Sequence, residues 1–262
     1  MESAGYALRP TIDRSWLERV AIADPVPHAY ARWDLLRYPD RVRFVSAVRG
    51  EATQAYLLLW PGRGALIVHY VGDPEAAEAL ATALPARPFV IVAPEDVHRS
   101  VERARGPTVT FPVLMMAARP GPAPGAAAAS VRRLLPDDRP ALLALTRTDG
   151  ELVASGYPAL DLAEEFVWGA FEDGALAGVA RRSVHLPDVW ILSGVFVSPR
   201  LRGRGLSHAL VRAVLADAAA ARVTVGLFVR EDRPAARTVY DRAGFRPIGR
   251  RLWIDAGSGL AP

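Results

Sequence analysis

The residues most suited to chemistry form a turn, Arg202-Gly-Arg-Gly-Leu-Ser207, between an apolar, strand-prone run and an amphipathic helical pattern. Gly203 and Gly205 carry no Cβ atom, so the backbone of this turn can approach a bound group closely. The first N–H groups of the following helix have no partners inside it, and the helix dipole makes that end positive. This order of strand, turn and helix predicts a site that binds a pyrophosphate mainly through main-chain amides.

The same residues also admit a plainer interpretation. The glycines could simply close the connection between a strand and a helix, with Arg200, Arg202 and Arg204 solvated around it. Because a glycine-rich turn taken alone does not separate these interpretations, the rest of the C-terminal half has to decide between them.

A second motif lies at residues 233–245, a short helical pattern that carries Tyr240 and ends in Gly244-Phe245. With both motifs in place, residues 130–255 resemble the GNAT superfamily of acyl-CoA-dependent N-acyltransferases. The phosphate-binding motif of that family reads Q/R-x-x-G-x-G/A, and its fixed positions are occupied here by Arg202, Gly205 and Ser207. The later family motif is matched by Ala236, Tyr240, Gly244 and Phe245, whereas Arg233 stands at its asparagine position.

The resemblance implies a binding site for acetyl-CoA or another acyl-CoA as co-substrate, with no metal. The pyrophosphate is expected on the amides of residues 203–208, and the pantetheine arm beside the backbone of strand residues, paired like an additional strand. One of the arginines of the turn, or Arg237, is expected to bind the 3′-phosphate. The implied binding residues are Phe196, Val197, Arg202, Gly203, Arg204, Gly205, Leu206, Ser207, His208 and Arg237.

The implied reaction is the transfer of an acetyl group to a primary amine by direct attack within a ternary complex. Such a transfer needs stabilisation of a tetrahedral intermediate and a proton for the leaving thiolate. The family position of Tyr240 makes it the expected acid, and the N–H of Val197 is a plausible oxyanion donor. The plainer interpretation of Tyr240 is a ring packed beneath the sheet.

The proton acceptor for the amine is left open. Candidate residues are Glu172 in a hairpin turn, acidic residues before that hairpin, and two residues flanking the next loop; ordered water is an alternative. The acidic residues are Glu151, Glu164 and Glu165, and the loop residues are His185 and Asp188. An acceptor pocket could be lined by Trp168, Tyr157, Trp190 and Phe228, although aromatic residues on strands belong to the core more often. Residues 24–34 could also contribute to it, or could simply cap a helix.

Composition excludes several other classes of function. The chain has no cysteine, so disulfides, thiol nucleophiles and thiolate metal ligands are absent. Its net charge of +4 is modest for 262 residues and argues against a dedicated nucleic-acid binder. The first residues lack the features of a signal peptide, and no apolar run suits a membrane span, so a cytoplasmic monomer or homodimer is expected.

A proline- and glycine-rich stretch at residues 119–129 predicts a linker between domains at 1–118 and 130–262. In the second domain, strands are expected at 130–135, 166–171, 175–185, 190–197, 222–229 and 245–254, and helices at 136–147, 208–221 and 234–243. The Asp173-Gly174 dipeptide between apolar runs predicts a hairpin.

The first domain is expected to repeat much of this order. Helices are expected at 16–22, 28–37, 74–84 and 95–104, and strands at 43–48, 55–60, 65–71, 89–92 and 108–117. Where the second domain has its glycine-rich turn, the first has Gly72-Asp-Pro-Glu75, whose acidic side chains would repel a phosphate. The first domain is therefore interpreted as a degenerate copy, with chance similarity of a common topology as the alternative.

These features together predict an α/β protein of the mixed α+β type: two similar domains in tandem, each a GNAT-like mixed sheet with flanking helices. The expected partners are acyl-CoA and a small-molecule or peptide amine, without nucleic acid or membrane. A non-catalytic module that senses acyl-CoA is the alternative function, because no base is identified and Arg233 replaces an asparagine.

Overall fold

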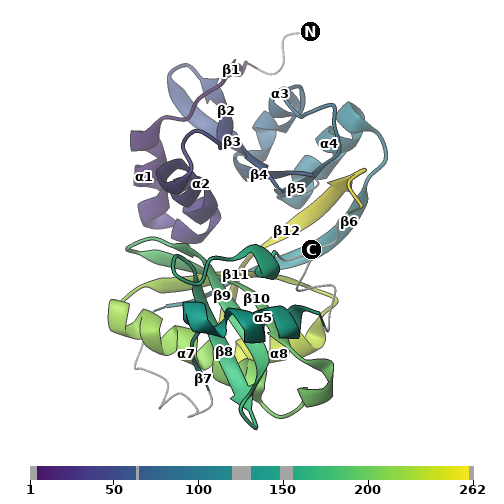
Figure 1. The fold of residues 1–262 in the computed structure, drawn as a ribbon. Coiled ribbons are helices and arrows are strands. Elements are labelled where there is room, and N and C mark those ends of the chain that lie inside the picture. The colour runs from purple at the N-terminus through teal and green to yellow at the C-terminus, as the bar shows by residue number, and fades with distance from the viewer. Residues whose placement is uncertain (1–4, 63–64, 120–130, 148–155, 260–262) are drawn as a thin grey trace. The chain divides into compact units, whose positions relative to one another are not determined.

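The computed structural model describes residues 5–62, 65–119, 131–147 and 156–259 (Figure 1). The chain divides into two compact units. Unit 1 consists of Met1–Met115, Val229–Asp232 and Ile248–Pro262, and unit 2 of Met116–Phe228 and Arg233–Pro247. Both units are discontinuous in sequence, whereas the predicted domain ranges are continuous. Most of the predicted linker lies outside the described residues.

Unit 1 starts with a short strand and a helical pair, continues with a hairpin, and ends in alternating strands and helices. The helical segments are α1 (Arg14–Ala23), α2 (Pro25–Arg37), η1 (Pro74–Ala76), α3 (Ala77–Ala81), η2 (Glu95–Val97) and α4 (His98–Arg105). The strands are β1 (Ala7–Arg9), β2 (Arg43–Arg49), β3 (Ala52–Pro61), β4 (Leu66–Gly72), β5 (Phe89–Ala93) and β6 (Val109–Ala118). The helix predicted at 74–84 is shorter than expected, because a 3-10 turn replaces its start and the α-helix already ends at Ala81.

Unit 2 has a similar order of strands and helices. Its strands are β7 (Val131–Arg133), β8 (Phe166–Glu172), β9 (Ala175–His185), β10 (Val189–Val197) and β11 (Thr224–Arg230), followed by β12 (Arg246–Ala256). Its helical segments are η3 (Pro136–Asp138), α5 (Arg139–Thr146), η4 (Tyr157–Ala159), η5 (Pro199–Leu201), α7 (Leu206–Ala221) and α8 (Pro234–Arg242). In the described part of the chain, no helix is long and apolar enough to cross a bilayer.

Strand pairing repeats between the units. In unit 1, β1–β2, β2–β3 and β3–β4 are antiparallel and β4–β5 is parallel. In unit 2, β7–β8, β8–β9 and β9–β10 are antiparallel and β10–β11 is parallel. The predicted hairpin is confirmed, with φ of 49° at Asp173 and 77° at Gly174. The predicted fold class, a mixed sheet with flanking helices in two tandem copies, is therefore confirmed.

The last strand of the chain completes unit 1 rather than unit 2. Leu252 to Ala256 of β12 pair antiparallel with Ala93 to Phe89 of β5, so β12 is the strand next to β5. Leu252 and Ile254 consequently pack into the hydrophobic core of unit 1.

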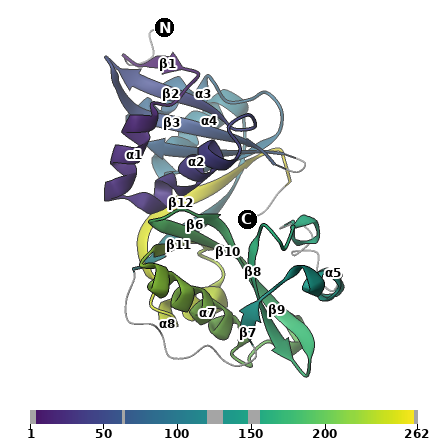
Figure 2. The same ribbon diagram turned by 60° about the vertical axis from the view of Figure 1, so that its left-hand side comes forward.

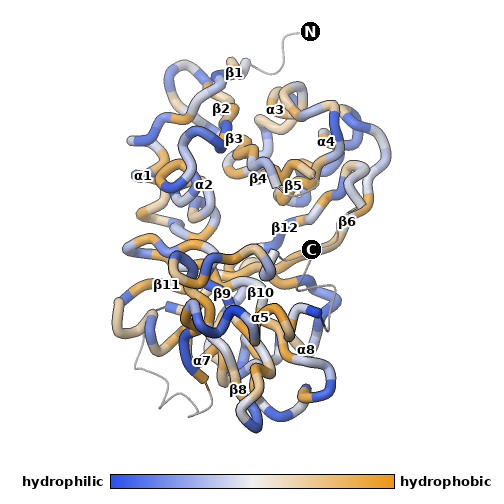
Figure 3. The backbone as a smooth tube through the Cα atoms, viewed as in Figure 1, coloured by the Kyte–Doolittle hydropathy of each residue, from blue (hydrophilic) through white to orange (hydrophobic). Residues whose placement is uncertain are grey.

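Helices cover both faces of the unit 1 sheet (Figure 2). One core lies under α3 and α4, and a second core, which includes Leu17, Ala31 and Tyr56, lies under α1 and α2. Between them, β5 is hydrophobic along its length (Figure 3), and all five of its residues are buried. A continuous apolar run is typical of a strand covered on both faces. In unit 2, α7 contacts β8, β9 and β10.

Candidate functional site

The candidate site of unit 2 begins with an irregularity in the middle of β10. Ser193 pairs with Arg181 and Phe196 pairs with Val179, so Gly194 and Val195 lie opposite a single residue of β9. This is a β-bulge, and Gly194 has a φ of +57°, which favours glycine. This bulge was not predicted from the sequence. An isolated glycine inside a strand pattern was the signal that could have revealed it.

Beyond the bulge, one edge of β10 becomes available. Its parallel pairs with β11 run from Val189 to Ile191. The N–H of Ser198 donates to Ala177 of β9, 2.9 Å away, and because amides alternate along a strand, the N–H of Val197 points away from β9. We call this side of residues 192–197 the open edge of β10. It presents main-chain groups in the way that an added strand requires.

The glycine turn, residues 202–207, connects this strand to α7. Gly203 and Gly205 have φ of +80° and +79°, and no atom lies within 4 Å of a Cβ built at either position. The first bond inside α7 runs from the N–H of Ala209 to the carbonyl of Gly205, and no side chain caps the helix. The amides of Leu206, Ser207 and His208 precede that bond, so the turn has the open backbone and uncapped amides that a pyrophosphate requires.

The arginines of the turn have different partners. The Nε of Arg202 donates to the carbonyl of Val197 at 3.2 Å, so this side chain folds back onto the end of β10. Arg204 forms an ion pair with Glu172 of the β8–β9 hairpin, at 2.7 Å. Arg200 is exposed. Arg237, on α8, is half-buried.

Tyr240 is positioned by the end of α8. Gly244 has a φ of +99°, which reverses the chain, and Phe245 is fully buried immediately afterwards. The Phe245 ring packs edge-on against the Tyr240 ring, with centroids 5.8 Å apart. This contact accounts for the spacing of the second motif. Burial raises the pKa of Tyr240 to about 12, so its hydroxyl is protonated at neutral pH and can act as an acid.

At the start of α8, Arg233 occupies the N-cap position and makes no side-chain capping bond. Asparagine is a preferred N-cap residue. Pro234 follows at the first position of the helix, which proline favours, and so compensates in part for the missing cap.

Tyr157 lies against the bulge. It is 1% exposed, and its hydroxyl donates to the carbonyl of Gly194 at 2.6 Å. Burial raises the pKa of Tyr157, with Arg181 opposing and the neighbouring Tyr240 and Glu165 reinforcing the shift. The structure therefore brings together Tyr157, Tyr240 and the Glu165–Arg181 ion pair.

The candidate proton acceptors have different partners and different exposure. Glu165 binds Arg181 through both carboxylate oxygens at 3.1 and 3.2 Å, and Glu172 is paired with Arg204. The ring of His185 packs on Phe166 at 4.8 Å, and the carbonyl of Asp188 accepts from Thr224. Glu164 is exposed. Glu151 lies outside the described residues.

Trp168 and Trp190, which were predicted to line the acceptor pocket, are buried among packed side chains. The Arg182 guanidinium lies 3.6 Å from the Phe166 ring centroid and 3.9 Å from that of Trp190. The indole of Trp168 donates to Asp217 of α7 at 3.2 Å. These contacts hold the tryptophans within the sheet and against α7. Phe228 is half-buried on β11.

The equivalent place in unit 1 is built differently. The β3–β4 register runs without a shift from Ala55 to Pro61. The side chain of Asp73 accepts from the N–H of Glu75, and the α3 helix that follows has only five residues. An acidic side chain therefore occupies the place where unit 2 has free amides. In residues 24–34, His28 bonds Tyr56 at 3.0 Å within the core, an arrangement that fits a structural role.

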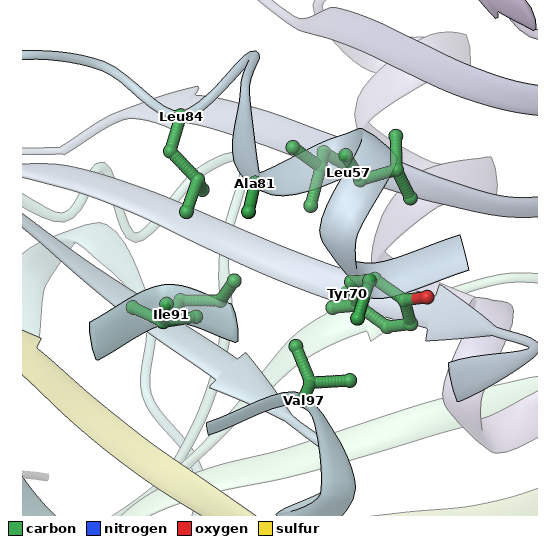
Figure 4. A pocket seen from close by; sticks show the side chains of 9 residues that line it. Leu57, Tyr70, Ala81, Leu84, Ile91 and Val97 are labelled. Carbon is green, nitrogen blue, oxygen red and sulfur yellow. The ribbon is translucent and has the colours of Figure 1, made fainter. Parts of the chain in front are cut away.

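Unit 1 contains an apolar hollow lined by core residues (Figure 4). Its lining is aliphatic apart from Tyr70, whose hydroxyl donates to the carbonyl of Asp73 at 2.5 Å. With its polar group already bonded, the hollow is part of the core beneath α3 and α4. Among the residues that the structure describes, no group of histidines and carboxylates is arranged to hold a metal ion.

Comparison with known proteins finds a family whose model matches the part of the chain that carries this site. Residues 130–245 match the model of the Acetyltransferase (GNAT) family. A mycothiol acetyltransferase of Nocardia farcinica is 38% identical over 119 residues, which are 44% of this chain and 38% of that protein.

Solved structures resemble the whole chain. A Drosophila protein matches with a TM-score of 0.73 at 17% identity, covering 96% of this chain and 98% of its own. A tandem GNAT protein from the clavulanic acid biosynthesis pathway matches with a TM-score of 0.58 at 18% identity, covering 96% and 99%. At these identities the likeness concerns the fold.

Proposed function

We propose that unit 2, whose residues 130–245 match the Acetyltransferase (GNAT) family model, transfers an acetyl group from acetyl-CoA to a primary amine. The observation that carries the proposal is the sequence of three backbone features along one strand and turn. The bulge at Gly194 is followed by the open edge at Val197, and then by the uncapped amides that begin α7 at Leu206.

The donor fits these residues in a defined order. The amides of residues 203–208 bind the pyrophosphate, and the open edge at Val197, next to Phe196, pairs with the pantetheine arm. Arg237 and the arginines of the glycine turn supply positive charge for the 3′-phosphate. The thioester supplies an activated carbonyl, so no group of the chain needs to be acylated.

The chain's own groups then assist direct transfer. The amine nitrogen forms a bond to the carbonyl carbon while the N–H of Val197 stabilises the developing oxyanion. The carbon–sulfur bond breaks, and Tyr240 gives its proton to the departing sulfur. The attacking nitrogen loses a proton to water, and Tyr240 regains a proton from solvent. Because the pKa of Tyr240 is raised to about 12, the hydroxyl is protonated when the step begins. The products are an amide and free CoA.

The acceptor is a small molecule or a peptide with a primary amine. Acceptors related to mycothiol are tested first, because the aligned relative carries that name and the match spans the acetyltransferase domain. The match covers 38% of that relative, so the acceptor is assigned by experiment.

The test combines binding and turnover. Calorimetry with acetyl-CoA is expected to give saturable binding, and release of free CoA thiol is expected to accelerate with one class of amine in a panel. Saturable binding without acceleration by any amine would favour the sensing module instead. Absence of binding would exclude both functions.

A further inference from the structure

Gly194 in the β10 bulge and the ring of Tyr157 pack closely against each other. A Cβ atom added at Gly194 would lie 2.8 Å from Cε2 and 2.9 Å from the hydroxyl of Tyr157. Glycine is thus required by the backbone angle and by the space that the ring occupies. The hydroxyl bonds the Gly194 carbonyl, so the ring and the hydrogen bond hold the same residue.

The bulge determines which amide reaches the open edge. One extra residue in a strand reverses the side to which every later N–H points. With the bulge present, the N–H of Ser198 faces β9 and that of Val197 faces the open edge. Without it, the two sides would be exchanged, and the N–H of Val197 would face β9.

Unit 1 provides an internal comparison. Its β3–β4 pairing has no register shift, and its parallel pairing of β4 with β5 comprises four residue pairs rather than the three of β10 with β11. The turn that follows is acidic and carries Asp73. The bulge therefore occurs in the copy that has the glycine turn and is missing from the copy that lacks it.

We propose that Tyr157 is a positioning residue for acyl transfer, which locks the β10 bulge and so holds the Val197 amide towards the reacting carbonyl. This inference rests on the proposed function. Tyr157 is buried and its hydroxyl is already engaged, so it acts through the backbone of β10 rather than on the substrates.

The decisive variant is Tyr157→Phe, which keeps the ring and removes the hydrogen bond. We expect kcat to fall by about 10-fold or more, because a misplaced oxyanion donor loses most of its effect. Acetyl-CoA affinity is expected to stay near that of the wild type, because the glycine turn is unchanged. Gly194→Ala disturbs the same lock from the other side and is expected to reduce kcat in the same way.

Tyr70→Phe is the matched control. Tyr70 is also 1% exposed, and its hydroxyl also donates to a main-chain carbonyl, that of Asp73. Both variants should lower the unfolding midpoint to a similar extent, but Tyr70→Phe should keep the wild-type kcat. Wild-type kcat in Tyr157→Phe, or an equal loss of kcat in both variants, would overturn the inference.

Hydrogen exchange tests whether Tyr157 fixes the β10 bulge, without a measurement of turnover. In Tyr157→Phe, the amides of Phe196 and Ser198 should exchange faster than in the wild type, whereas Tyr70→Phe should leave them unchanged. Unchanged exchange in Tyr157→Phe would refute the lock. If the wild type shows no transfer while exchange responds as expected, the proposed function fails and the structural role of Tyr157 stands.

Discussion

Arg202 is hydrogen-bonded to the strand that precedes it, because its Nε donates to the main-chain carbonyl of Val197 at 3.2 Å. The N–H and carbonyl of one strand residue point to the same side, so this bond lies on the open edge of β10. The arginine thus fixes the junction between the strand and the glycine turn.

Arg202→Met is expected to weaken acetyl-CoA binding by about 10-fold, since a charge-assisted hydrogen bond that orders the turn is lost. Arg200→Met removes the same charge from an exposed neighbouring position and is the control. Isothermal titration of both variants checks the prediction. Equal effects would mean that charge alone, rather than the bond to Val197, matters.

Gly205→Glu is expected to weaken acetyl-CoA binding by at least about 10-fold, because it places a negative charge at the start of α7. Gly50→Glu is a matched control. Gly50 also has a positive φ, +63° against +79°, and no atom lies within 4 Å of an added Cβ at either position. The conformational cost is therefore similar, and only Gly205→Glu should impair binding in calorimetry.

Tyr240→Phe is expected to lower kcat by about 100-fold while acetyl-CoA binding is retained, because a proton donor is lost without a change of shape. Steady-state kinetics with a good acceptor, together with calorimetry, check this outcome. A variant with wild-type kcat would remove Tyr240 from the mechanism.

The raised pKa of Tyr240 also predicts a pH dependence of stability. The folded pKa of about 12 exceeds the usual value of 10.0, so the protonated phenol is favoured by folding. Its stabilising effect is complete below pH 10 and is lost as the pH rises towards 12. Tyr240→Phe should show a smaller decrease in unfolding midpoint across this interval than the wild type.

Asp34 predicts a sensitivity of the same sign, at lower pH. Burial raises the pKa of this carboxyl from 3.8 to about 7, although Arg41 opposes the shift. The folded state therefore favours the protonated acid, and the free energy of unfolding falls as the pH rises from 3.8 to 7. Asp34→Asn should be more stable than the wild type at pH 8 in denaturant unfolding. Equal stability there would show that burial of Asp34 has no cost.

The contribution of β12 to the stability of unit 1 can be measured by replacing two of its isoleucines with alanine, one at a time. Ile254 is fully buried in the core of unit 1, whereas Ile248 is 44% exposed. Ile254→Ala should lower the free energy of unfolding by about 2–5 kcal/mol, and Ile248→Ala by less than about 0.5 kcal/mol. Denaturant unfolding monitored in unit 1 checks both. Similar losses would contradict the pairing of β12 with β5.

Much of the fold follows from local patterns in the sequence. The Asp173-Gly174 dipeptide fixes a hairpin, and the apolar run of β5 marks a strand covered on both faces. The pairing of β12 with β5 could not be predicted in this way. Each half ends in a similar strand, so hydrophobic pattern alone does not decide which sheet each of these strands completes.

The candidate site, like the fold, could be predicted from the sequence only in part. The glycine turn was predictable because Gly203 and Gly205 are local signals, and both have positive φ. The contact between Tyr157 and Gly194 was not predictable, because it joins residues 37 positions apart and depends on how the chain packs. For the same reason, the partners of Glu165 and Glu172 emerged only from the structure.

The placement of β12 in the sheet of unit 1 has a consequence for how the gene could be divided between the two units. A gene segment ending before residue 248 would encode unit 1 without its strand next to β5, and a segment starting after β6 would carry a strand that belongs to the other unit. Loss or exchange of either half would therefore leave one unit with a missing or an unmatched strand. The copy that carries Asp73 in place of a glycine turn thus shares its sequence boundaries with its neighbour, whether or not it takes part in the chemistry.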